Sequence, residues 1–150
     1  MSPWLSIPII ALTLVLASGG AFAQSVSLKG VWRIVEIVDV EGQVDVSPHP
    51  GLYIFTDRYY SIQWVTAPRT ASPDNPSDKD KLAAWTPFIA NSGTYELKGN
   101  ALSTRPLVAK NPNVMTGSGG TAELRFEGGN TVYLTSTNPT GATIKLQRVE

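Results

Sequence analysis

Apolar and polar residues alternate with a period of two along most of this chain, as expected for β-strands with one buried face. The clearest case is residues 121–127, in which Ala122, Leu124 and Phe126 alternate with charged side chains. Applied along the whole sequence, this criterion predicts eight strands, at residues 31–40, 52–56, 59–66, 94–98, 101–107, 121–127, 131–137 and 142–149.

One segment lacks this alternation and has the features of a short helix. Ser77 and Asp80 have the spacing of a capping box at the start of the segment SDKDKLAAW, whose Ala, Leu and Lys residues favour helix. Pro87 then ends or bends the helix. The helix is therefore predicted between the third and fourth strands, after a proline-rich loop.

The lengths of the connections predict how the strands are arranged. In an up-and-down meander, successive connections fall at alternate ends of the sheet. Every short connection would then lie at one end and every longer one at the other. The short ones are 57–58, 99–100 and 128–130, and the longer ones are 41–51, 67–93, 108–120 and 138–141. The fold predicted is all-β, an eight-stranded up-and-down antiparallel β-barrel with a plain base and an elaborated mouth.

Three residues are predicted to close the base of this barrel. Trp32 begins the first strand and Arg148 ends the eighth, so barrel closure brings them together. An arginine over the indole face would add a cation–π contact of about 1–2 kcal/mol when desolvated. Gly30 lets the backbone pass close beneath the barrel.

This arrangement resembles the lipocalin and calycin pattern, and more closely the bacterial and fungal lipocalin-like domain family. The segments that carry the resemblance are GVWRIVEI, PGLYIFTDRYYSIQWV, an Ala-rich helix, GTYELKGNALSTRP and GTAELRFEGGNTVYLT, in that order. They extend over residues 28–149. The resemblance implies a β-barrel able to hold a small molecule, and it implies no particular reaction.

The first 23 residues have the pattern of a secretory signal peptide. An apolar stretch over residues 7–17 is followed by Ala21-Phe22-Ala23, a small-x-small cleavage site. The stretch is shorter than the about 20 apolar residues that cross a bilayer, and the chain has no cysteine to carry a lipid. The sequence thus predicts a mature single domain over residues 24–150, exported to the periplasm or the cell exterior, without a stable membrane anchor after cleavage.

Charge and composition narrow the classes of function. Twelve basic residues balance twelve acidic ones without a basic cluster, so nucleic acid is not a predicted partner. With no cysteine and a single histidine, the chain predicts no metal site and no cofactor. That histidine, His49, lies between two prolines and is interpreted as a solvated loop residue.

The alternation of inward and outward positions along the first predicted strand also indicates a candidate polar site inside the barrel. Glu36 shares the face of Trp32, and an inward carboxylate needs a basic partner or a raised pKa. Arg105 and Arg125 are the candidate partners. Alternatively, a β-bulge shifts the register and leaves Glu36 facing solvent.

The aromatic residues exceed what the base requires. Either they fill the barrel or they line a ligand pocket, and the candidates for the pocket wall are Tyr53, Phe55, Trp64 and Tyr95. Trp85 and Phe88 on the helical segment could cover the mouth.

Three hypotheses of function follow. The first is a barrel that binds a small hydrophobic or amphipathic molecule. The second is a metal-free isomerase or cyclase that uses Glu36 with an arginine or Tyr95 as proton donor. The third is a protein-binding barrel with a filled core and with Val114 and Met115 exposed on its mouth loops. The sequence does not define an oligomeric state.

Overall fold

The structure is a computed structural model that describes residues 27–69, 74–117, 119–137 and 141–150. The predicted signal peptide, residues 1–23, lies outside the described residues. The strands are β1 (Gly30–Val38), β2 (Val44–Asp45), β3 (Gly51–Phe55), β4 (Tyr59–Val65), β5 (Phe88–Lys98), β6 (Ala101–Ala109), β7 (Thr121–Glu127), β8 (Thr131–Ser136) and β9 (Thr143–Arg148). An α-helix, α1 (Asp78–Trp85), and a 3₁₀ helix, η1 (Pro112–Met115), lie in two of the connections.

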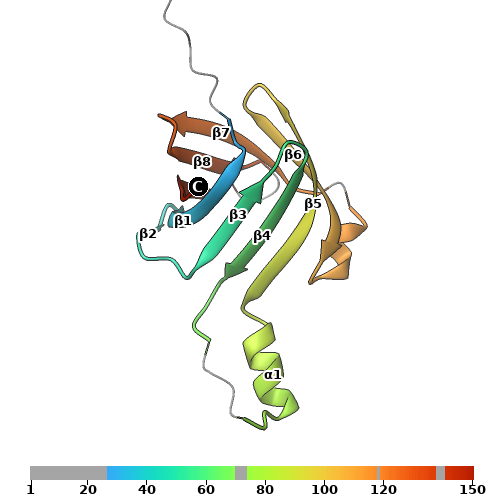
Figure 1. Ribbon diagram of the computed structural model, residues 1–150. Helices are drawn as coiled ribbons and strands as arrows, with labels where there is room; N and C mark the ends of the chain where they lie inside the picture. Colours follow the sequence, from blue (N-terminus) through green and yellow to red (C-terminus); the bar gives the residue numbers. More distant parts are fainter. Residues whose placement is uncertain (1–26, 70–73, 118, 138–140) are drawn as a thin grey trace, which may run out of the picture.

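The strands form an antiparallel β-barrel in which each of the eight main strands pairs with its neighbours along the chain (Figure 1). Pairing of β1 with β9 closes the sheet, so the predicted up-and-down barrel is confirmed. The ninth strand, β2, is an addition to one edge of β1. Residues Gly30–Arg33 of β1 pair with β3, whereas Ile37 and Val38 pair with β2.

The base of the barrel is built around Trp32, whose side chain is completely buried. Its indole Nε1 donates a hydrogen bond of 2.7 Å to the Leu28 carbonyl oxygen. The Arg148 guanidinium lies 4.1 Å from the centre of the Trp32 ring and donates to the carbonyl oxygens of Ser27, Lys29 and Gly129. The start of β1, the end of β9 and the turn after β7 are therefore tied together at one arginine.

The structure corrects the predicted order of the elements at one point and the predicted bounds of a strand at another. The helix lies between β4 and β5, so the prediction that it lies between the third and fourth strands is wrong. The reason is β2, two exposed residues within the first long connection that carry no alternation of their own. In addition, β5 begins at Phe88 and not at residue 94, because residues 88–93 complete the ladder with β4.

The helix α1 matches the predicted segment and is held by its own ends. Ser77 accepts a hydrogen bond from the Asp80 backbone N–H, and the Asp80 side chain accepts one from the Ser77 backbone, which completes the capping box. That hydrogen bonding to Ser77 lowers the pKa of Asp80. The helix buries none of its side chains and projects from the mouth end of the barrel (Figure 1). No helix among the described residues is both long and apolar enough to cross a membrane.

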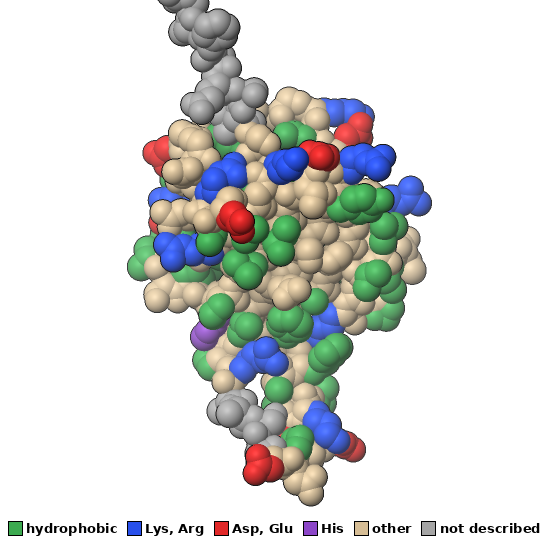
Figure 2. All heavy atoms as spheres, viewed as in Figure 1, with side chains coloured by type: hydrophobic (Ala, Val, Ile, Leu, Met, Phe, Trp, Pro, Cys, Tyr) green, Lys and Arg blue, Asp and Glu red, His purple; other side chains and the backbone are tan. Residues whose placement is uncertain are grey.

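Charged side chains are distributed without segregation on the face shown in Figure 2, where basic and acidic groups are interspersed. Several apolar side chains are exposed on and beside α1, among them Leu82, Trp85 and Ile89. Lys110 lies 5.1 Å from the centre of the Trp85 ring and also donates to the Thr86 and Phe88 carbonyl oxygens. This lysine connects the end of β6 to the chain that follows α1.

Candidate ligand-binding site

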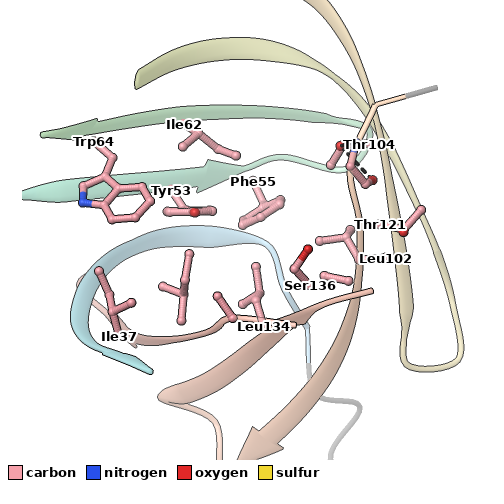
Figure 3. Close-up of a pocket in the computed structure, with 14 residues that line it drawn as sticks. Ile37, Tyr53, Phe55, Ile62, Trp64, Leu102, Thr104, Thr121, Leu134 and Ser136 are labelled. Carbon is pink, nitrogen blue, oxygen red and sulfur yellow. Dashed lines mark hydrogen bonds between the residues drawn. The ribbon is translucent and has the colours of Figure 1, made fainter. Parts of the chain in front are cut away.

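A cavity of about 310 Å³ lies inside the mouth half of the barrel and is lined by 14 residues (Figure 3). The larger lining side chains come from facing strands and point toward one another across it. They are Tyr53 and Phe55 on β3, Ile62 and Trp64 on β4, Leu134 on β8 and Ile144 on β9. The wall is therefore aromatic and aliphatic for most of its extent.

The cavity exists because side-chain size differs between the two halves of the barrel. At the base, Trp32, Leu124, Val132 and Leu146 are fully buried and fill the interior. Toward the mouth, several positions on or just before the last three strands are small. Gly120, Ala122, Ser136 and Ala142 occupy these positions opposite the aromatic residues of β3 and β4.

The polar side-chain groups of the lining residues are four hydroxyls and the indole N–H of Trp64, and none of the described lining residues is charged. The Thr104 hydroxyl is held by Gly120, with which it both donates and accepts hydrogen bonds of 3.0 Å. The Thr121 hydroxyl bonds the Thr137 hydroxyl at 2.6 Å. Ser136 also has an interaction partner. The hydroxyl of Tyr53 makes no hydrogen bond to any described residue.

Burial shapes the acidity of the interior phenols. Burial alone raises the pKa of Tyr53 far above its ordinary value of 10.0. Burial also raises the pKa of Tyr60, and the nearby Thr104 hydroxyl opposes that rise in part. Both side chains are therefore neutral hydrogen-bond donors over the whole physiological pH range.

Glu36 does not line the cavity. The register between β1 and β9 shifts between Ile34 and Glu36, so that Ile34 pairs with Leu146 while Glu36 pairs with Lys145. As a result Ile37, and not Glu36, presents its side chain to the cavity. This is the bulge that the sequence left as the alternative arrangement.

The two candidate arginines also lie outside the cavity. Arg125 is exposed, and its guanidinium sits 3.8 Å from the centre of the Tyr133 ring. Arg105 is exposed and borders a second hollow next to Tyr95. Neither arginine forms the expected buried pair with Glu36, and among the described residues no group of three His, Cys, Asp or Glu side chains could hold a metal ion.

The structure brings together three of the four candidate aromatic residues. Tyr53, Phe55 and Trp64 line the cavity. Tyr95 instead packs edge-on against Phe55, with ring centres 5.3 Å apart, and its hydroxyl donates to the Thr56 carbonyl oxygen at the base. Tyr95 therefore contacts the cavity wall through Phe55 and does not line the cavity itself.

The residues proposed for the mouth do not cover this cavity. Trp85 is 55% exposed on α1, and neither it nor Phe88 is among the lining residues. The Arg69 guanidinium lies 5.3 Å from the centre of the Phe88 ring. Val114 and Met115 are exposed, as the protein-binding hypothesis expects, but the cavity differs from the filled core that the same hypothesis requires.

Several lining residues were missed from the sequence although the signal for some was present. Alternation from Leu102 puts Thr104 on the same inward face, and both line the cavity. Ile37 could not be found in this way, because the bulge reverses the alternation of β1. Gly120 lies outside any strand, and its contribution comes from its contact with Thr104.

The fold of this chain is similar to that of solved lipocalin-like β-barrels. It is similar to a lipocalin-like protein from Bacteroides uniformis, with a TM-score of 0.53 and 16% sequence identity over 81% of this chain and 97% of the other. It is also similar to an uncharacterized protein from Bacteroides eggerthii, with a TM-score of 0.50 and 13% identity over 81% and 99% of the two chains. No protein-family model matches the chain, and no curated protein matches it in sequence. These similarities establish the fold.

Proposed function

We propose that this protein is a binding barrel that holds one small hydrophobic or amphipathic molecule in the cavity at its mouth. The observation that carries the proposal is the cavity itself, about 310 Å³ in volume and lined by aromatic and aliphatic side chains. Ligand sites in proteins are concave, mostly apolar and about 300–1,000 Å³ in volume, with a few polar groups that orient the ligand.

The volume limits the size of the ligand. An engineered apolar cavity of about 150 Å³ accommodates benzene, so a cavity twice as large has room for a molecule of about two fused rings or a short branched chain. A long-chain lipid would have to extend through the mouth.

The lining disfavours the enzymatic alternative. Acid–base catalysis needs a titrating group within hydrogen-bond reach of the reacting atom. Glu36, the carboxylate named for that role, lies outside the cavity, and the described lining residues include no other carboxylate. Binding is therefore the better-supported function.

Native mass spectrometry of the protein purified from its own host tests the proposal. We expect a recurrent small-molecule adduct that is lost in Trp64→Ala, because Trp64 forms part of the cavity wall. Trp85→Ala is the matched control, since Trp85 is exposed on α1 and does not line the cavity. Equal loss of the adduct in both variants, or a clean apo mass together with no uptake of hydrophobic fluorescent probes, would reject the proposal.

Export is a separate part of the proposal. It rests on the apolar segment and the small-x-small motif that precede Gln24. The mass of the mature protein recovered from the periplasm or the culture medium should correspond to a chain that begins at Gln24. Recovery of the uncleaved chain from the cytoplasm would reject it.

A further inference from the structure

We infer that the ligand is a neutral molecule with a hydrogen-bond acceptor, such as a ketone, ester or alcohol, and that the Tyr53 hydroxyl binds this acceptor. The inference rests on the proposed binding function and specifies the chemistry of the same cavity.

Tyr53 is distinguished from the other hydroxyls of the cavity by its lack of a partner. Its side chain is only 6% exposed and lines the cavity, yet its hydroxyl bonds no described residue. Thr104 bonds Gly120, Thr121 bonds Thr137, and Ser136 also has an interaction partner. Because this unpartnered phenol lines the cavity, a ligand in the cavity can supply the hydrogen-bond acceptor that the protein itself does not offer.

The position of Tyr53 fixes how a ligand would lie. Tyr53 pairs with Trp32 on one side and Ile62 on the other. Phe55, which lies nearer the base on the same strand, also lines the cavity, so an acceptor bonded to Tyr53 would lie part-way along the cavity, between Trp64 and Phe55 (Figure 3).

The absence of charged side chains around the cavity disfavours an ionic ligand. None of the described lining residues is charged, so a carboxylate or an ammonium group placed beside Tyr53 would be desolvated without a counter-ion. The Tyr53 phenol stays protonated because burial raises its pKa, and it can therefore donate to a neutral oxygen. A pure hydrocarbon would leave the phenol without a partner.

Tyr60 provides a matched control within the same sheet. Its side chain is 3% exposed and its hydroxyl also lacks a hydrogen-bond partner among the described residues, but Tyr60 does not line the cavity. Removing either hydroxyl deletes an unpartnered phenolic oxygen, and that of Tyr60 is fully buried. The two variants should differ in ligand binding alone.

The test uses three naphthalene probes of nearly identical shape, titrated by calorimetry into the purified protein and its variants. They are acetylnaphthalene, which has a carbonyl oxygen, its hydrocarbon isostere isopropenylnaphthalene, and naphthoate, which is ionised at neutral pH. We expect the protein to bind acetylnaphthalene about fivefold more tightly than isopropenylnaphthalene, the ratio that one net hydrogen bond supplies. Naphthoate should bind more weakly than both.

Tyr53→Phe should abolish the preference for the carbonyl probe without weakening the binding of the hydrocarbon, whereas Tyr60→Phe should retain it. Thermal unfolding without ligand should show Tyr60→Phe as stable as the parent or more so, because it loses a buried unsatisfied hydroxyl, and Tyr53→Phe as stable as the parent. Equal affinities for the two neutral probes, loss of the preference in Tyr60→Phe, or tightest binding of naphthoate would overturn the inference while the binding function stands. Failure of all three probes to bind would overturn both.

Discussion

At the base of the barrel, the identity of residue 30 is determined by how closely the start of β1 approaches the C-terminal residues Arg148 and Glu150. Gly30 has a φ of 134°, and a Cβ atom there would lie 2.4 Å from both the Arg148 Nη1 atom and the Glu150 carbonyl oxygen. Only glycine avoids both the backbone strain and the clash. The cation–π contact between Arg148 and Trp32 therefore depends on the absence of a side chain at residue 30.

Replacing Gly30 with alanine should lower the free energy of unfolding by about 1–3 kcal/mol, since strain at a residue with positive φ adds to the displacement of Arg148. Urea unfolding followed by tryptophan fluorescence measures the change. Gly129→Ala is the control, because a Cβ there meets no heavy atom within 4 Å, and it should change stability by less than about 0.5 kcal/mol. Equal effects of the two substitutions would contradict this account of the base.

The raised pKa of Tyr53 has a consequence for alkaline stability. The folded state holds the phenolic proton more tightly than the unfolded state, so its contribution is complete below the ordinary pKa of 10.0 and declines as pH rises above it. Tyr53→Phe should reduce the fall in unfolding free energy above pH 10 by up to about 1.4 kcal/mol per pH unit. Urea unfolding at a series of pH values tests this, and an unchanged slope in the variant would refute it.

At the scale of elements, the sequence predicted those whose determinants are local. The strand Thr121–Glu127 matches its prediction because apolar and charged residues alternate strictly along it. The helix Asp78–Trp85 matches because Ser77, Asp80 and Pro87 mark its ends. For both elements, the information lies within the segment itself.

Elements determined by distant pairing were predicted less well. The first half of β5 contains Asn91, Ser92 and Gly93, which are poor strand formers, and it is extended because β4 lies beside it. The bulge in β1 follows from its pairing with β9 and has no local marker. That bulge decides the candidate site, because it places Ile37 in the cavity where simple alternation had placed Glu36.

The helix α1 buries no side chain, so its stability should be uncoupled from that of the barrel. Ser77→Ala removes the capping box and should destabilise the helix by about 1 kcal/mol. We expect faster amide hydrogen exchange over Asp78–Trp85, with unchanged exchange in the barrel strands. Faster exchange of the barrel amides in Ser77→Ala than in the parent would show instead that α1 stabilises the barrel.

At the scale of the whole molecule, stability and the candidate function are located in different halves of one barrel. The base contains the fully buried side chains and the hydrogen bonds of Arg148 that join the chain ends. The mouth half has the cavity, and small residues there forgo packing that larger ones could supply. A substitution that fills the cavity should therefore weaken ligand binding without lowering the stability of the fold.

Ala122→Met makes this separation testable. Ala122 lines the cavity, so the longer side chain should occupy part of the 310 Å³ and weaken binding of acetylnaphthalene at least tenfold. Because space is already present, the free energy of unfolding should be unchanged or rise by up to about 1 kcal/mol. Ala101→Met, at an exposed position on the neighbouring strand, is the control and should affect neither property. A loss of 1–3 kcal/mol in Ala122→Met would indicate an overpacked interior with no cavity, and full retention of binding would place the ligand elsewhere.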